Sequence, residues 1–312
     1  MLPNSVLNVD KLRLCFLGPR KLAEQMEEKV EIKRRDFTMT KIYQSKVGCQ
    51  FLVKVRDESS PFREISDELG TLKLGNILQS SPFSSGQYFF WFDVKNRQLY
   101  NSREGISAQK RAAEVARLLG LTFYKLTYIE LAADSPVNYL PRISEALSNP
   151  TMQVYTLGKA PDTRTDEYRG LNWEIWQSAT TITNTALRIK NREKTMELYC
   201  YDKLKEIAVS GKTYILSANQ AGGNSLWRYE IRLHGDALDE YLKKRGVDHT
   251  DLFPTDSLRP DLLADMYDYF AQRLIRGKMY RGTTLARKSL QFWEFPESAF
   301  IPLISIGGLN AH

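Results

Sequence analysis

Adjacent pairs of predicted strands, separated by helices, constrain the fold of this chain more than any other feature. Residues 39–56 read as two strands around Lys46-Val47-Gly48, and residues 180–202 read as a long hairpin that turns at residues 191–194. Strands joined by a short turn pair antiparallel, whereas parallel strands need a crossover connection. The pattern therefore predicts an α+β fold with a central antiparallel β-sheet flanked by helices.

The remaining elements are expected along the whole chain. Predicted strands cover residues 71–78, 87–93, 122–132, 152–158, 172–178 and 226–233. Predicted helices cover residues 18–32, 106–119, 138–147, 203–209, 236–245 and 261–276. The first helix places Leu22, Met26 and Val30 at four-residue spacing. Residues 246–260 have two prolines and no apolar periodicity, which indicates a linker. We therefore expect one domain over residues 1–245 and a mainly helical segment over residues 246–312.

Histidines and cysteines limit the metal chemistry of the chain. The three histidines, His234, His249 and His312, lie far apart, and the three cysteines have no C-x-x-C spacing. This excludes HExxH proteases and zinc ribbons. A metal site must then use the oxygens of Asp and Glu, which are the ligands that Mg²⁺ or Mn²⁺ prefers.

Charge and hydropathy narrow the class of partner. The formal net charge is +7 and the isoelectric point is near 9.1, which suits a polyanion but is also common among soluble enzymes. The longest uncharged, largely apolar stretch near the C-terminus, residues 298–309, is too short to span a membrane. The N-terminus has no signal-peptide apolar core. We expect a cytoplasmic protein with no membrane partner.

Two acids occupy the strand predicted near residue 130. Glu130 and Asp134 share a face of a regular strand, and buried carboxylates are costly unless they are paired or bind a metal. A strand that ends in a solvated Asp-Ser-Pro turn accounts equally well for Asp134. For Glu130, a structural role and a metal-binding role are both open at this point.

A tyrosine and a lysine meet where a predicted strand ends and a predicted helix begins. Tyr199, Tyr201 and Lys203 share one strand face, and a helix that starts near Asp202 places Lys203 and Glu206 on one side. A tyrosine becomes a nucleophile near neutral pH only if a cation or metal stabilises its phenolate. The alternative is an amphipathic strand with a solvated lysine.

Three charges alternate along the strand predicted at residues 226–233. Arg228, Glu230 and Arg232 share a face. They form either a solvent-facing ladder of ion pairs, or a carboxylate metal ligand between guanidinium groups that bind phosphate.

The ordered segments resemble a family of rolling-circle replication initiators. Filamentous-phage gene II proteins and the Rep-trans initiators of small plasmids and CTX-type phages carry Y-x-K-x-x-E, followed by R-[FY]-E-x-R. This chain carries Tyr201-x-Lys203-x-x-Glu206 and then Arg228-Tyr229-Glu230-x-Arg232. Those families also carry an earlier R-x-D-x-x-x-D strand.

The earlier segment departs from the family pattern. Tyr128 replaces the arginine of R-x-D-x-x-x-D, Glu130 replaces the first aspartate, and Asp134 matches the second. The resemblance covers roughly residues 120–245, so it lies within the first expected domain.

This resemblance implies a nicking and joining enzyme. Tyr201 would attack a phosphodiester at an origin and form a 5′-phosphotyrosine link, while Lys203 and Arg232 would stabilise the charge on phosphorus. Glu130 and Glu230, with Asp134 and Asp202 as weaker candidates, would hold Mg²⁺ or Mn²⁺. Partners implied are origin DNA, as a single strand or hairpin, a host helicase and polymerase, and a second copy of the chain in a homodimer.

The C-terminal segment supplies further candidates for DNA contact. Residues 271–290 contain six basic residues and no acidic residue, with Tyr280 among them. The DNA-binding candidates are Arg228, Arg273, Arg276, Lys278, Arg281, Arg287 and Lys288. The alternative for this segment is a helix end followed by a solvated loop.

Two other functions fit the same residues. One is a relaxase for plasmid mobilisation, which uses the same tyrosine chemistry. The other is a sequence-specific DNA-binding protein without catalysis.

Overall fold

The computed structural model divides into two compact units, each continuous in space but not in sequence. Unit 1 comprises Met1–Val9, Glu130–Tyr241 and Pro260–Leu303, and unit 2 comprises Asp10–Ile129, Leu242–Arg259 and Ile304–His312. The structure describes residues 6–45, 48–56, 65–75, 87–100, 108–149, 151–156, 172–177, 184–191, 193–218, 225–252, 260–281 and 284–285.

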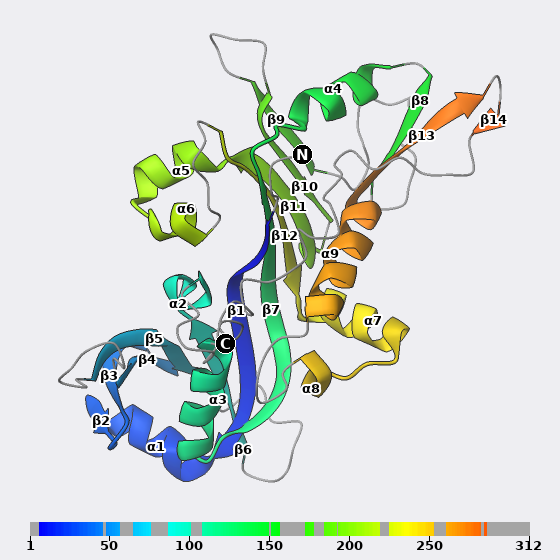
Figure 1. The fold of residues 1–312 in the computed structure, drawn as a ribbon. Coiled ribbons are helices and arrows are strands. Elements are labelled where there is room, and N and C mark those ends of the chain that lie inside the picture. The colour runs from blue at the N-terminus through cyan, green and yellow to red at the C-terminus, as the bar shows by residue number, and fades with distance from the viewer. Residues whose placement is uncertain are drawn as a thin grey trace, which may run out of the picture. The chain divides into compact units, whose positions relative to one another are not determined.

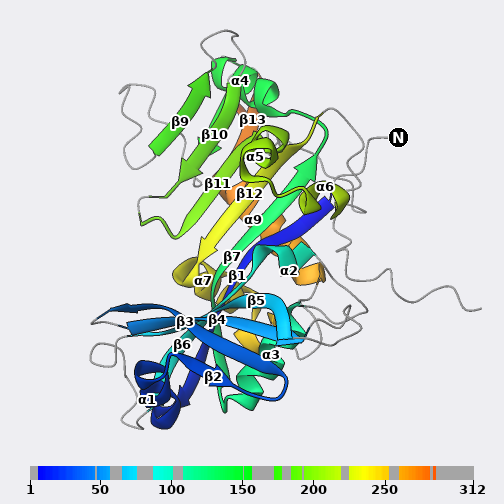
Figure 2. The same ribbon diagram turned by 90° about the vertical axis from the view of Figure 1, so that its left-hand side faces the viewer.

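An antiparallel sheet forms the centre of unit 1. Its strands are β7 (Thr122–Ser135, of which Glu130–Ser135 belongs to this unit), β9 (Asn172–Gln177), β10 (Asn184–Lys190), β11 (Met196–Asp202) and β12 (Trp227–His234). They lie in the order β7-β12-β11-β10-β9 (Figure 2). The pairs β12/β11, β11/β10 and β10/β9 are antiparallel, which confirms the predicted fold class.

One face of β11 and β12 is apolar and packs on a helix. Leu198 lies opposite Ile231 and Cys200 lies opposite Tyr229, and all four side chains are buried. Helix α9 (Pro260–Leu274) passes behind these strands in Figure 2, and the Tyr267 hydroxyl donates a 2.9 Å hydrogen bond to the carbonyl oxygen of Tyr229. Burial of each large apolar side chain here contributes about 1.5–3 kcal/mol. The opposite face of the strands is left for polar chemistry.

A short helix follows β11 on that opposite face. Helix α5 (Lys203–Ser210) begins where the Asp202 carboxylate accepts a 3.1 Å hydrogen bond from the Lys205 backbone N–H. It ends at Gly211, whose φ of +71° is a conformation that glycine adopts without steric cost. Figures 1 and 2 place α5 and α9 on opposite sides of β11 and β12. The predicted helix at residues 203–209 is therefore confirmed, whereas α6 (Tyr214–Ala218) was not predicted.

A second, smaller sheet also belongs to unit 1. Strands β8 (Met152–Thr156), β13 (Ile275–Arg281) and β14 (Thr284–Leu285) lie in the order β14-β13-β8. Helix α4 (Leu140–Ser148) precedes β8, and β13 follows α9 directly. The predicted helix at residues 261–276 is confirmed as α9, but Ile275 and Arg276 begin a strand that the apolar spacing did not reveal.

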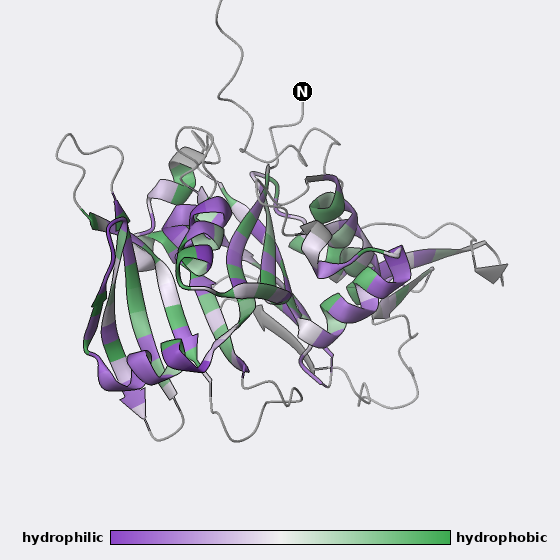
Figure 3. Cartoon of the chain, turned by 90° about the horizontal axis from the view of Figure 1, so that it is seen from below, coloured by the Kyte–Doolittle hydropathy of each residue, from purple (hydrophilic) through white to green (hydrophobic). Residues whose placement is uncertain are grey.

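Unit 2 is also built on antiparallel strands. Its strands are β1 (Val6–Pro19, from Asp10 onward), β2 (Glu31–Lys33), β3 (Phe37–Ser45), β4 (Gly48–Arg56), β5 (Ile65–Leu74) and β6 (Gln87–Val94). The order is β2-β3-β4-β5-β6-β1, followed by the first half of β7. Every second residue of β4 is buried, and Figure 3 shows hydrophobic and hydrophilic residues alternating along the strands.

Helices of unit 2 are α1 (Arg20–Glu28), α2 (Asn96–Tyr100), α3 (Ala108–Leu118) and α8 (His249–Leu252). Helix α7 (Gly235–Arg245) contributes residues to both units. In α1, Leu22 and Met26 are buried as predicted. Val30 lies beyond the end of this helix and is 70% exposed, so its predicted place on the apolar stripe is wrong.

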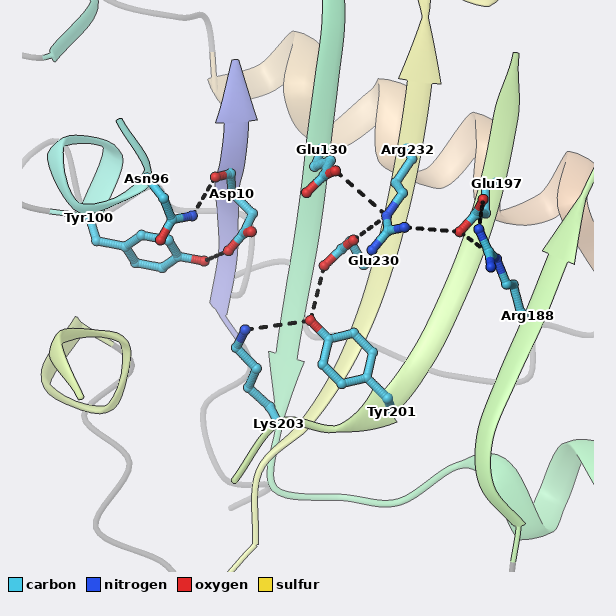
Figure 4. A network of polar contacts seen from close by, with 10 residues as sticks. All are labelled: Asp10, Asn96, Tyr100, Glu130, Arg188, Glu197, Tyr201, Lys203, Glu230 and Arg232. Atoms are coloured by element: carbon cyan, nitrogen blue, oxygen red, sulfur yellow. Dashed lines mark hydrogen bonds and ion pairs between the residues drawn. The ribbon is translucent and has the colours of Figure 1, made fainter. Parts of the chain in front are cut away.

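Unit 2 also contains a buried acid that the sequence analysis did not single out. Asp10 lies in β1, and its carboxylate accepts a 2.6 Å hydrogen bond from the Tyr100 hydroxyl (Figure 4). The Asn96 side chain donates to the backbone oxygen of Asp10. Strand β1 was not predicted, although the alternation of charged and apolar residues from Lys11 to Leu14 is typical of a half-buried strand.

The predicted division at residue 245 does not follow the two units. Residues of the expected first domain lie in both units, and the predicted linker contains α8. Among the described residues, no helix has both the length and the apolar composition needed to cross a membrane.

Candidate active site

Tyr201 lies near the end of β11, on the face opposite α9. Its side chain is half-buried, and its hydroxyl donates a 3.1 Å hydrogen bond to Oε2 of Glu230 in β12 (Figure 4). Glu230 is 1% exposed. The phenol is therefore neither buried in the apolar core nor free in solvent, and its proton already points at a carboxylate.

Lys203 supplies a cation to the same hydroxyl. Lys203 is the first residue of α5. Its backbone N–H donates a hydrogen bond to the carbonyl oxygen of Leu226, which fixes the residue at the end of the sheet. The side chain is 2% exposed, and Nζ lies 3.4 Å from the Tyr201 hydroxyl oxygen. An ammonium at this distance favours the phenolate over the phenol.

Glu206 holds the ammonium in place from the next turn of α5. Its Oε2 atom lies 2.6 Å from Lys203 Nζ. Burial alone would raise the pKa of the Glu206 carboxyl, but its hydrogen bond with Lys203 and the charges of Lys203 and Lys212 leave that pKa below its ordinary value. The prediction that Lys203 and Glu206 lie on one side of this helix agrees with this contact.

Arg232 lies among three carboxylates on the same face of the sheet. Its Nε atom donates to Glu230 and lies 3.6 Å from Oε1 of Glu130, while a terminal nitrogen donates a 3.2 Å hydrogen bond to Glu197 (Figure 4). Burial would lower the pKa of this guanidinium, but the charges of the surrounding glutamates raise it above the ordinary value. Arg232 therefore stays charged at any working pH.

Glu197 was missed by the sequence analysis. It accepts two 2.9 Å hydrogen bonds from Arg188 of β10, in addition to the bond from Arg232. Two guanidinium groups on one carboxylate fix the orientation of both. Strand alternation could have found it, because Glu197 falls on the same face as Tyr199 and Tyr201.

Tyr199 is a second tyrosine beside the first. Its ring stacks on that of Tyr201 with 4.6 Å between centroids, and Arg232 lies 5.3 Å from its centroid. Burial raises the pKa of the Tyr199 hydroxyl, although the charges of Arg232 and Arg188 act in the opposite direction. Of the two neighbouring phenols, only Tyr201 forms the bonds to Glu230 and Lys203 described above.

Two of the predicted metal ligands lie together. Glu130 and Glu230 are each 1% exposed, and a carboxylate oxygen of one lies within 4.8 Å of a carboxylate oxygen of the other. Two buried anions at this spacing need a cation, and Arg232 supplies one charge for both. The residues fit a hard divalent cation, because all of their donors are carboxylate oxygens.

The other predicted ligands have different partners. Asp134 accepts two 2.6 Å hydrogen bonds from Arg228, and neither side chain is exposed. This pair takes both Asp134 oxygens, and Arg228 cannot reach DNA without leaving it. Asp202 caps α5 through Lys205. The shared strand face of Glu130 and Asp134 was predicted correctly, but the partner of Asp134 was not.

The predicted basic segment is divided among several environments. Arg273 pairs with Glu240 at 2.8 Å. Arg276 and Lys278 lie on β13 beside Tyr155. Arg281 ends that strand, and its side chain, together with residues Arg287 and Lys288, lies outside the described residues.

The chain has a structural likeness among known proteins. No family model matches the sequence, and no curated protein matches it. The chain is similar to a rolling circle replication initiator protein from Geobacillus stearothermophilus. The two share 12% sequence identity over 91% of this chain and 93% of that chain, with a TM-score of 0.47.

Proposed function

We propose that this chain is a replication initiator that nicks and rejoins origin DNA through a covalent bond to Tyr201. One observation carries the proposal: the Tyr201 hydroxyl lies between a buried carboxylate, Glu230, and a buried ammonium, Lys203. The sequence motifs that resemble rolling-circle initiators converge on the same residues. A phenol in this setting is prepared to lose its proton and attack.

The proposed reaction is a transesterification at phosphorus. The Tyr201 oxygen forms a bond to the phosphorus atom as its proton passes to Glu230, the carboxylate that already accepts its hydrogen bond. The bond from phosphorus to the 3′ oxygen breaks, and that oxygen takes a proton from solvent to become a 3′ hydroxyl. The product is a 5′-phosphotyrosine link with no net change in the number of phosphate ester bonds.

Two cations of the site support this step. Lys203 stabilises the phenolate before attack, since its ammonium lies 3.4 Å from the oxygen. Arg232, held by glutamates on either side, presents a fixed guanidinium for the phosphate oxygens as charge develops on them. Mobile cations would have to be ordered first, which would cost free energy at the transition state.

A divalent cation fits the carboxylates of Glu130 and Glu230. Such a cation, when bound, polarises the scissile phosphate and neutralises part of its charge. Because Arg232 also neutralises these carboxylates, the guanidinium would share them with the metal or turn toward the substrate. Mg²⁺ and Mn²⁺ are the ions that suit an all-oxygen set.

The reverse chemistry closes the cycle. A free 3′ hydroxyl attacks the phosphotyrosine and loses its proton to solvent, the bond between phosphorus and the Tyr201 oxygen breaks, and the phenol takes a proton from Glu230. Between the two steps the first 3′ hydroxyl would prime a host polymerase while a helicase opens the duplex. These partners, and a homodimeric assembly, follow from the resemblance of the motifs and belong to the proposal.

The test is nicking of supercoiled plasmid that carries the origin of the encoding element. With Mg²⁺ or Mn²⁺, the chain should convert supercoiled to open-circular plasmid, and Tyr201→Phe should abolish conversion while binding of single-stranded origin DNA persists. Tyr199→Phe is the matched control, because it removes a hydroxyl from the stacked neighbour and should retain nicking. Nicking by Tyr201→Phe would refute the tyrosine assignment, and no nicking by the wild type would favour a non-catalytic DNA-binding protein.

A further inference from the structure

A second group of cations and an aromatic ring lies on the small sheet of unit 1. Strands β8 and β13 are antiparallel, with Tyr155 directly opposite Arg276. The Arg276 guanidinium carbon lies 5.5 Å from the centroid of the Tyr155 ring, and Lys278 Nζ lies 5.8 Å from it. All three side chains are partly exposed, on strands different from those that carry Tyr201 and its partners.

Neither cation of this group is neutralised within the described part of the chain. Arg276 and Lys278 form no ion pair there, and Nε of Arg276 is buried without a hydrogen-bond partner. Arg273, three residues before Arg276, shows the contrast, since its guanidinium pairs with Glu240. A buried N–H donor costs free energy unless it is satisfied, so the arrangement suits an anion supplied from outside.

Buried residues on the other face of the β8–β13 strand pair fix its orientation. Val154 of β8 and Ile275 of β13 are buried, whereas Tyr155, Arg276 and Lys278 alternate with the inward residues. Strand periodicity therefore keeps the ring and both cations on one face. A single strand of nucleic acid fits this face, because its phosphates can pair with the two cations and an unpaired base can stack on the aromatic ring.

We propose that Tyr155, Arg276 and Lys278 bind single-stranded DNA, with a base stacked on Tyr155 and phosphates paired with the two cations. The identity of the polyanion as DNA rests on the proposed function. The ring favours a single strand, because the bases of a duplex are already stacked on one another. The site would hold DNA while the tyrosine site carries out the chemistry.

The test is the affinity of the full chain for a fluorescein-labelled single-stranded oligonucleotide, measured by anisotropy in EDTA so that no covalent capture occurs. Tyr155→Ala should weaken binding by about 5- to 100-fold, and Tyr155→Phe, which keeps the ring, should stay within about twofold of wild type. Arg276→Gln and Lys278→Gln should each reduce the slope of log affinity against log salt by about 0.7. Arg142→Gln is the matched control, because it removes one positive charge from an exposed position on α4, and it should change affinity less than either.

Each outcome decides the inference. Equal affinity of Tyr155→Ala and wild type for the single strand would overturn it, as would an equal loss of affinity for a duplex of the same sequence. The proposed function is tested separately by covalent adduct formation. If wild type forms no adduct but Tyr155→Ala still loses affinity, the DNA-binding site stands and the nicking proposal fails.

Discussion

The Tyr201 hydroxyl donates a hydrogen bond to Glu230, although the two residues are not directly opposite one another in the sheet. The register of β11 and β12 pairs Tyr201 with Arg228 and Glu230 with Tyr199, so the 3.1 Å bond runs diagonally across one face. Diagonal neighbours on a sheet face are within reach of a long aromatic side chain. The stacked ring of Tyr199 fills the position directly opposite Glu230 and limits where the Tyr201 ring can lie.

Replacement of Lys203 tests the role of the ammonium. Lys203→Met keeps a side chain of similar length but removes the charge, and we expect the rate of adduct formation to fall about 100- to 1000-fold. Lys205→Met is the control on the same helix, since the Lys205 side chain is 75% exposed and should not affect the rate. A Lys203→Met rate within threefold of wild type, measured in single-turnover assays, would show that the ammonium does not assist the phenol.

The ion pair of Glu206 predicts how stability depends on pH. The pKa of Glu206 is below its ordinary value of 4.5 in the folded chain, so the pair stabilises the fold above pH 4.5. This stabilisation is lost as the pH falls from 4.5 through the folded pKa. Urea denaturation of wild type and Glu206→Gln between pH 3 and 7 should show the difference between them narrowing toward low pH. A difference that stays constant would contradict the assignment.

The buried pair of Asp134 and Arg228 contributes to the fold. Asp134→Ala leaves a guanidinium without a partner in the interior, so we expect a loss of about 3–5 kcal/mol in the free energy of unfolding. The double variant Asp134→Leu with Arg228→Met removes both charges and should recover much of this loss. Urea denaturation measures both variants. A loss below about 1 kcal/mol for Asp134→Ala would mean that the pair is not buried in solution.

Metal binding is predicted to depend on Glu130 and Glu230. Glu130→Gln and Glu230→Gln should each weaken Mn²⁺ binding, measured by calorimetry, by about tenfold or more, because each replaces an anionic ligand with a neutral amide. Glu197→Gln is the matched control from the same face, since Glu197 is held by two arginines. Equal Mn²⁺ affinity for all three variants and wild type would exclude this pair of glutamates as the metal site.

The sequence predicted which side chains of the site share a strand face, but it did not predict which side chains they contact. Strand alternation predicted that Tyr201 and Lys203 share one face of their strand. It also predicted that Arg228, Glu230 and Arg232 share one face of a second strand, because the backbone fixes the period of a strand. The partners of these residues depend on register and on strands distant in sequence. Nothing local to Asp134 indicates that Arg228 neutralises it.

In the fold, strand pairs that are adjacent in sequence were predicted, whereas a strand whose partner lies far along the chain was not. Hairpins that are continuous in sequence, such as β3–β4 and β10–β11, were predicted because turn residues separate two apolar runs. Strand β1 pairs with β6, which follows it only after five other elements, so no hairpin turn marks this pair in the sequence. Only the first two residues of strand β13, Ile275 and Arg276, fell within the predicted helix at residues 261–276, and the rest of this strand was not predicted.

The most direct test of the account is the identity of the residue that becomes linked to DNA. The full chain should be incubated with single-stranded and hairpin origin oligonucleotides and Mn²⁺, digested with protease and nuclease, and analysed by tandem mass spectrometry. The account predicts a nucleotide attached through phosphate to Tyr201, with no such product from Tyr201→Phe. A nucleotide on Tyr199 or on any other residue, or an adduct that persists in Tyr201→Phe, would contradict it.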